Sequence, residues 1–190
     1  MIDLSNILHW LDIETEFLDI EIQGLCIDSR KIKQGNLFIA HNGENYHGMN
    51  FSYQVQRSGA KAILAESYIQ GKVKPKARQQ PLTIPIIEID NLAEKIGQIA
   101  SNFYQQPSAK LNLIGITGTN GKTSSAWLLV QAWEKLGVKG AYIGTLGFGT
   151  TTQLNPLKNT TPSSIELNQI LFGIVNQGIN HVAMEVSSNG

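Results

Sequence analysis

The chain has 190 residues, 42% of them hydrophobic and 16% charged, and its 15 basic and 15 acidic residues cancel. This is the composition of a globular protein with a buried core, and it argues against a nucleic-acid partner; no apolar run approaches the roughly 18 residues of a membrane span. The one cysteine, Cys26, excludes an internal disulfide and is expected to be buried, while the N-terminus lacks a signal-peptide pattern and favours a cytoplasmic protein.

The first half of the chain predicts short strands alternating with helices. A polar, proline-containing stretch at 70–83 predicts a solvated loop. A helix is expected at 91–104, with Asp90 as its N-cap. Apolar runs bounded by turn residues predict strands within 24–30, 35–43, 61–66 and 84–90, and a short helix closed by Gly59 is expected at 51–60.

After a polar linker at 105–110, strands and helices alternate strictly. Strands are expected at 111–117, 138–146 and 179–186, separated by helices at 122–136 and 162–178 and by a long polar loop at 147–161. The first helix has an apolar face that includes Leu136, and the second begins with a capping box from Ser163 to Glu166. This alternation predicts an α/β fold with a parallel sheet.

The segment LIGITGTNGKTSSAWLL at 113–129 predicts a phosphate-binding turn between a strand and a helix. Gly118 and Gly121 allow a tight turn that a ligand can approach closely, and the helix N-terminus favours an anion. Lys122 can reach phosphate oxygens, and the Thr123 hydroxyl can bind Mg²⁺. The general P-loop pattern would place glycine where Ile116 stands, so a simple glycine turn with an incidental lysine is the alternative. Glu185, near the carboxyl edge of a parallel strand, suits a Mg²⁺ held together with Thr123.

Four stretches carry a resemblance to a known family. GITGTNGKTS at 115–124 resembles the phosphate loop of the Mur ligases, a superfamily of ATP-dependent amide-forming enzymes. IDSRKIKQGNLFIAHNGENYHG at 27–48 is similar to the uridine-nucleotide domain of its MurE and MurF types. NTTP at 159–162 and MEVSSNG at 184–190 resemble MurE segments, although Asn189 stands where that type usually has histidine.

The resemblance implies two domains and their site residues. It divides the chain into a small N-terminal α/β domain at 1–104 that binds the UDP substrate, a linker at 105–110, and the first part of a parallel-sheet P-loop ATPase domain at 111–190. Lys122 would be catalytic, and Thr123 and Glu185 would hold Mg²⁺. ATP would be bound by Gly118, Thr119, Asn120, Gly121, Lys122, Thr123 and Ser124, and the UDP-linked substrate by Ile27, Ser29, Glu44, Asn45, Tyr46, Asn159, Thr160, Thr161 and Ser187.

The resemblance further implies an ATP- and Mg²⁺-dependent ligase of peptidoglycan precursor synthesis. It would join a diamino acid, whose identity these residues leave open, to UDP-N-acetylmuramoyl-L-alanyl-D-glutamate through an acyl phosphate. It would need no nucleic acid, membrane or obligate protein partner. Because Mur ligases are much longer, this chain is expected to be a truncated ligase that is inactive alone.

Several alternatives stay open at the level of sequence. The chain could be a UDP-sugar-binding module with a vestigial ATP loop, the inactive product of an interrupted reading frame, or a P-loop ATPase unrelated to the cell wall. Ser29 and the stretch GENYHG could belong to plain turns, and the threonines before Pro162 could simply cap a helix. His181 is expected to be structural, and no role is assigned to His9, His41 or His47.

Overall fold

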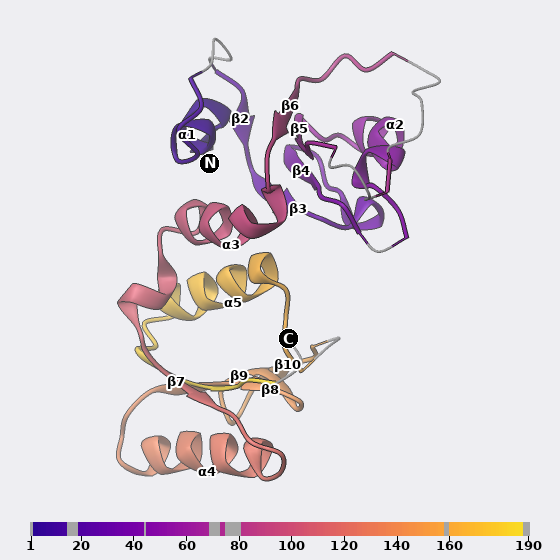
Figure 1. Ribbon diagram of the computed structural model, residues 1–190. Helices are drawn as coiled ribbons and strands as arrows, with labels where there is room; N and C mark the ends of the chain where they lie inside the picture. The colour runs from indigo at the N-terminus through magenta and orange to yellow at the C-terminus, as the bar shows by residue number, and fades with distance from the viewer. Residues whose placement is uncertain are drawn as a thin grey trace. The chain divides into compact units, whose positions relative to one another are not determined.

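The computed structural model describes residues 2–14, 19–43, 45–68, 73–74, 81–157 and 160–187. The chain divides into two compact units, residues 1–99 and 100–190, and each is built around a sheet of mainly parallel strands (Figure 1). The predicted α/β class is confirmed. None of the helices among the described residues is long and apolar enough to cross a membrane.

The first unit holds a four-stranded parallel sheet in the order β3-β4-β5-β6 and a separate antiparallel pair, β1-β2. Two 3₁₀ helices, Ser29–Lys31 and Gly48–Phe51, lie in the loops on either side of β4. Helix α3 begins in this unit and continues into the second. The elements are β1 (Ile2–Asp3), α1 (Leu4–His9), β2 (Glu21–Ile22), β3 (Gly24–Cys26), β4 (Asn36–Ala40), α2 (Ser52–Arg57), β5 (Ala62–Glu66), β6 (Ile86–Ile89) and α3 (Leu92–Phe103).

Continuous apolar runs explain why β4 and β5 form the centre of this sheet. Every residue of both strands is buried, as expected of parallel strands that are covered on both faces. Phe38 and Ile63 pack with Val55 of α2. Cys26 is buried as predicted, and burial raises the pKa of its thiol. The pair β1-β2 and helix α1 were not predicted from the sequence.

The start of α3 differs from the prediction. The helix begins at Leu92, so Asp90 is not the residue that precedes it. Instead, the buried carboxylate of Glu66 accepts hydrogen bonds from the backbone N–H of Ala93 at 3.3 Å and from that of Asn42 at 2.6 Å. A side chain distant in sequence therefore satisfies a helix N-terminus, which a local capping pattern does not reveal.

Glu66→Ala is expected to lower the free energy of unfolding by about 2–3 kcal/mol, because it leaves the Asn42 and Ala93 N–H groups without this acceptor. Urea denaturation followed by circular dichroism measures the change. Glu88→Ala, at an exposed position of neighbouring β6, is the matched control and should have little effect. Equal stability losses in the two variants would contradict the capping role.

The second unit holds a five-stranded sheet in the order β10-β9-β8-β11-β7. Strands β7, β11 and β8 are parallel, whereas β9 and β10 run antiparallel at one edge. A 3₁₀ helix, Pro107–Lys110, precedes the sheet. The elements are β7 (Asn112–Ile116), α4 (Lys122–Lys135), β8 (Gly140–Gly144), β9 (Gly147–Gly149), β10 (Leu154–Asn155), α5 (Ser164–Asn176) and β11 (His181–Glu185).

The prediction of a polar loop at 147–161 is wrong, because this segment contains β9 and β10. Among the described residues the sheet therefore has five strands rather than the three expected. Gly147 and Gly149 have φ of 123° and 135°, a region that side chains rarely adopt. Phe148 between them packs against the core of this unit. The glycines and the threonine-rich turn obscure the apolar alternation that would have indicated a hairpin.

Helices α4 and α5 cover opposite faces of this sheet (Figure 1). The Ser163 side chain accepts a hydrogen bond from the Glu166 N–H, so the predicted cap of α5 is confirmed. Leu136, expected on the apolar face of α4, is 78% exposed and lies beyond the helix, which ends at Lys135. The carboxyl ends of β7, β8 and β11 meet at one edge of the sheet, where ligands bind in open α/β sheets.

Candidate functional site

The turn between β7 and α4 is open to solvent. Residues 118–121 are all exposed, and Gly118 and Gly121 have φ of 147° and 79°. A Cβ atom at Gly121 would meet no other heavy atom within 4 Å, so the backbone there borders free space. The first N–H groups of α4 have no acceptor within the helix, and its dipole places partial positive charge at the same point. The turn therefore has the geometry of an anion site.

Lys122 directly follows this turn, and its side chain reaches back to it. It is the first residue of α4, and its Nζ donates a hydrogen bond to the backbone carbonyl of Gly118 at 2.6 Å. The ammonium thus lies beside the exposed amides, where it can meet a bound phosphate. Thr119, Asn120 and Ser124, also predicted to bind ATP, are exposed around it.

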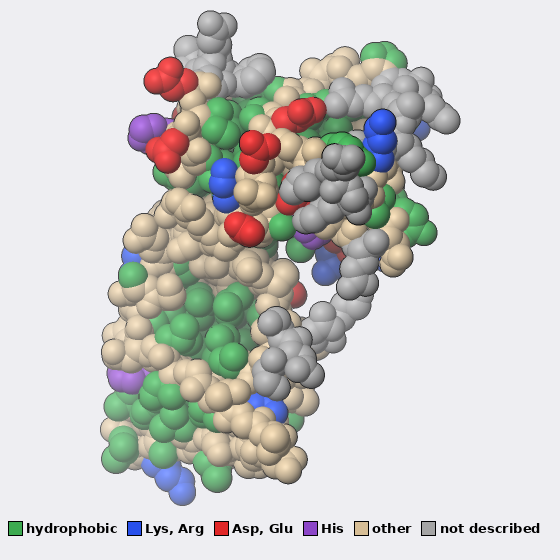
Figure 2. Space-filling model, viewed as in Figure 1, with side chains coloured by type: hydrophobic (Ala, Val, Ile, Leu, Met, Phe, Trp, Pro, Cys, Tyr) green, Lys and Arg blue, Asp and Glu red, His purple; other side chains and the backbone are tan. Residues whose placement is uncertain are grey.

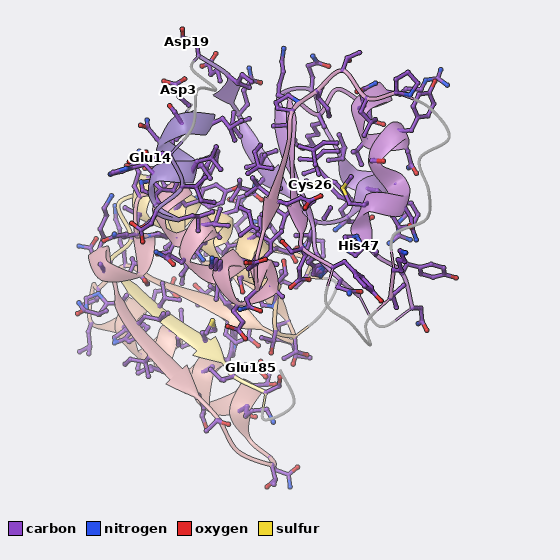
Figure 3. The ribbon with its side chains drawn as sticks, turned by 45° about the horizontal axis from the view of Figure 1, so that its top comes forward. Asp3, Glu14, Asp19, Cys26, His47 and Glu185 are labelled. Carbon is purple, nitrogen blue, oxygen red and sulfur yellow. The ribbon has the colours of Figure 1, made fainter. Side chains whose placement is uncertain are left out.

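Glu185 lies beside the turn at the carboxyl end of β11 and is 1% exposed (Figure 3). Its Oε2 accepts hydrogen bonds from the hydroxyls of Thr123 at 3.0 Å and Thr145 at 3.1 Å. Its Oε1 accepts from the Thr145 N–H at 3.0 Å and from the Tyr142 hydroxyl. The structure therefore brings the two predicted Mg²⁺ ligands, Thr123 and Glu185, into contact.

These hydrogen bonds also set the charge of the site. Burial by itself raises the pKa of the Glu185 carboxyl, but the hydrogen bonds from Tyr142, Thr145 and Thr123 outweigh it and lower the pKa below its ordinary value. Burial, together with the neighbouring Glu185, raises the pKa of Tyr142 to about 12. At neutral pH the carboxylate is charged and the phenol keeps its proton.

The donor set fits a magnesium ion. A hydroxyl and an ionised carboxylate are hard oxygen ligands, and Mg²⁺ in nucleotide sites typically takes one or two protein ligands and completes its shell with phosphates and water. Within the described ranges, no group of three or more His, Cys, Asp or Glu residues could hold a metal. The pair Thr123–Glu185 supplies one hydroxyl and one carboxylate, which are ligands of this kind.

The predicted substrate threonines lie next to this pair. The Thr160 hydroxyl is 3.4 Å from that of Thr145, and the Thr161 hydroxyl is 2.9 Å from that of Ser187. Thr145 and Tyr142 were not singled out from the sequence; Thr145 directly follows the end of the parallel strand β8, which was a signal for it, whereas Tyr142 lies in the middle of that strand. Asn159 and Asn189 lie outside the described residues.

The remaining predicted substrate residues lie in the first unit. Ser29 opens a 3₁₀ helix two residues after Ile27 instead of ending the strand, and Asp28 caps that helix. Tyr46 is 62% exposed, its ring edge against Phe51, and Asn45 beside it is exposed. Glu44 is not among the residues that the structure describes.

His47 (labelled in Figure 3) anchors this loop. It is 1% exposed, its Nδ1 accepts a hydrogen bond from the Met49 N–H, and its Nε2 lies 3.1 Å from the carbonyl oxygen of Glu66. These contacts give it a structural part in the fold.

On the face that Figure 2 shows, Lys and Arg side chains are dispersed rather than gathered into one patch.

Arg30→Ala is expected to raise the pKa of Asp28 from about 2 toward 3.8, because the hydrogen-bonded guanidinium favours the charged carboxylate. Since the native pKa is the lower one, the pair stabilises the fold above about pH 4, and this contribution disappears as the pH falls toward 2. Carbon-13 NMR of the carboxyl group measures the titration. Arg57→Ala should leave it unchanged, and an unaltered Asp28 in Arg30→Ala would contradict the pairing.

Comparison with known proteins places these features in one family. Residues 21–104 match the family model described as Mur ligase family, catalytic domain, and residues 116–190 match the one described as Mur ligase middle domain. The UDP-N-acetylmuramoyl-L-alanyl-D-glutamate–2,6-diaminopimelate ligase of Vibrio vulnificus is 38% identical over 189 residues, which are 99% of this chain and 37% of that protein. The ligase of the same name from Blochmanniella floridana is 44% identical over 170 residues, 89% of this chain and 34% of its own.

Solved structures agree with the fold. A structure of a ligase of that same name superposes with a TM-score of 0.75 at 25% identity and covers 100% of this chain and 36% of its own. MurF from Thermotoga maritima in complex with ADP shares the fold, with a TM-score of 0.55 at 17% identity over 90% of this chain and 34% of its own. The chain spans about a third of the length of the curated relatives it matches.

Proposed function

The chain belongs to the Mur ligase family, and on that premise we propose that it supplies the UDP-sugar-binding and ATP-phosphate-binding parts of a peptidoglycan-precursor ligase. The reaction would add a diamino acid to UDP-N-acetylmuramoyl-L-alanyl-D-glutamate. The names of the relatives favour 2,6-diaminopimelate as the diamino acid. The carrying observation is the contact between Thr123 at the phosphate turn and the ionised Glu185.

Each group in the second unit has a proposed part in the chemistry. The amides of 118–124 and the Lys122 ammonium bind the phosphates of ATP, and Thr123 and Glu185 hold Mg²⁺, which neutralises phosphate charge when bound. The γ-phosphoryl group of ATP passes to the free carboxylate of the substrate, and ADP leaves. The amine then attacks the acyl phosphate and loses a proton, so that the amide bond forms as inorganic phosphate leaves. The protein contributes by positioning the reactants and neutralising charge.

Each of the two units has its own substrate-binding residues in this proposal. Ile27, Ser29 and the segment 44–46 bind the UDP moiety, whereas the segment 159–161 and Ser187 hold the peptide carboxylate that accepts the phosphoryl group. We propose that the protein acts in the cytoplasm, without an obligate protein partner. We expect binding but no ligation from these 190 residues by themselves.

Two binding measurements on the chain test this function, displacement of a labelled nucleotide and isothermal titration with ADP and Mg²⁺. We expect UDP-N-acetylmuramoyl-L-alanyl-D-glutamate to compete with a labelled uridine nucleotide, and ADP with Mg²⁺ to bind at a separate site. Binding of the UDP compound without ADP would favour a UDP-sugar-binding module. Binding of ADP without the UDP compound would favour an unrelated P-loop ATPase, and failure of both would refute the proposal.

A further inference from the structure

Tyr142 is a polar residue at an apolar position. Its side chain is 0% exposed at the centre of β8, in a cluster with Ala126, Val130 and Ala183. A phenylalanine would fill the same volume, so the hydroxyl is what distinguishes tyrosine here. That hydroxyl donates to Oε1 of Glu185 and accepts a hydrogen bond from the Leu146 N–H at 3.3 Å.

The two carboxylate oxygens of Glu185 accept hydrogen bonds from different sets of donors. Tyr142 and the Thr145 N–H hold Oε1, which leaves Oε2 turned toward the hydroxyls of Thr123 and Thr145. The phenol ring is itself fixed, since Trp127 packs edge-on against it with centroids 5.5 Å apart and planes at 87°. A rigid aromatic ring thus determines which carboxylate oxygen faces the phosphate turn.

Gly144 provides the space for this arrangement. A Cβ atom at this position would lie 2.6 Å from the Tyr142 hydroxyl and closer still to Oε1 of Glu185. Gly144 and Tyr142 are two residues apart on β8 and so point to the same side of the strand. The glycine therefore leaves room for the phenol and the carboxylate to meet.

We propose that Tyr142 is a positioning residue for the cation site: its hydroxyl holds Oε1 of Glu185 so that Oε2 faces Thr123. This inference rests on the proposed function of the site. Partners that orient a metal ligand typically change metal affinity 10- to 100-fold when they are removed. Tyr142 touches neither nucleotide nor substrate in this scheme and acts through Glu185.

The first test reports the carboxylate position without any ligand. In Tyr142→Phe the ring and its ring current stay, and the hydroxyl contacts to Glu185 and to the Leu146 N–H are lost. The Leu146 amide changes through its own lost contact, so the Thr145 amide, which donates to Oε1 of Glu185, is the signal that reports the carboxylate position. We expect this signal to shift and its hydrogen exchange to quicken about tenfold. Tyr104→Phe, which removes a hydroxyl from another tyrosine of the same unit, should leave the Thr145 amide unchanged. An unchanged amide in Tyr142→Phe would overturn the proposal.

The second test measures the cation. Electron paramagnetic resonance of free Mn²⁺, titrated into the 190-residue chain with saturating ADP, should show about tenfold weaker Mn²⁺ binding in Tyr142→Phe than in wild type. Gly144→Ala, whose new methyl group displaces the same pair, should weaken it at least as much. Equal Mn²⁺ affinity in wild type and Tyr142→Phe would overturn the inference alone. A wild-type chain that binds no Mn²⁺ with ADP would overturn the proposed function, and the amide signal would then decide by itself whether Tyr142 positions Glu185.

Discussion

Lys122→Ala should weaken the binding of ADP with Mg²⁺ about 100-fold. Charge-assisted hydrogen bonds to phosphate contribute roughly 1.5–3 kcal/mol each, and about 2.7 kcal/mol corresponds to a factor of 100. The Nζ atom lies 2.6 Å from the carbonyl oxygen of Gly118, within the open turn, so the substitution removes a side-chain cation from the proposed phosphate site. Isothermal titration with ADP measures the change.

Lys135→Ala is the matched control for this prediction. Lys135 is the last residue of the same helix and is exposed, so its replacement changes the net charge equally but acts at the far end of α4. We expect ADP affinity to stay within a factor of two. Similar losses in the two variants would mean that overall charge, and not the turn, attracts the nucleotide.

Gly48→Ala should lower the free energy of unfolding by about 3 kcal/mol, near the upper end for overpacking a well-packed site. The new Cβ atom would lie 2.5 Å from Cα and 2.8 Å from the carbonyl carbon of Ala40. Both atoms belong to the backbone of β4, which pairs with strands on both sides and cannot move freely. Urea denaturation measures this loss of stability. Gly48 begins the 3₁₀ helix that follows the loop containing Tyr46.

Gly97→Ala gives the opposite expectation within the same unit. Gly97 lies inside α3, and a Cβ atom there would meet nothing within 4 Å. Alanine is the better helix former by about 1 kcal/mol, so the variant should be equally or more stable than wild type. If Gly48→Ala matched it in stability, the close packing of Gly48 against β4 would be refuted.

Most of the fold was predicted from the spacing of apolar residues along the sequence. The buried runs of β4 and β5 and the capped helix α5 are encoded by neighbouring residues, and the structure confirms them. The two-residue strands β1, β2 and β10 are too short to give a period, and tertiary pairing alone defines them. The cap of α3 was mispredicted for a related reason, since Glu66 reaches it from β5.

The candidate site also has a part that a local segment of sequence predicts and a part that depends on tertiary pairing. The turn between β7 and α4 is one continuous segment, so its glycines, Lys122 and Thr123 could be predicted as a phosphate site from order and spacing. Tyr142 and Thr145 reach Glu185 across 43 and 40 residues of sequence. Their contact depends on the register of β8 against β11, in which Tyr142 pairs with Ala183. Such a register is decided by the whole sheet and is not written in any short motif.

The hydrogen bond from Lys122 to the Gly118 carbonyl has a thermodynamic consequence. A lysine free in solvent loses up to about 2 kcal/mol of rotamer entropy when it is immobilised, whereas this one is already held over the turn. In the proposed phosphate site, Lys122 would exchange the carbonyl acceptor for a charged phosphate oxygen, which is a stronger acceptor, without first being immobilised. Preorganisation of this kind should appear calorimetrically as a small entropic penalty on nucleotide association.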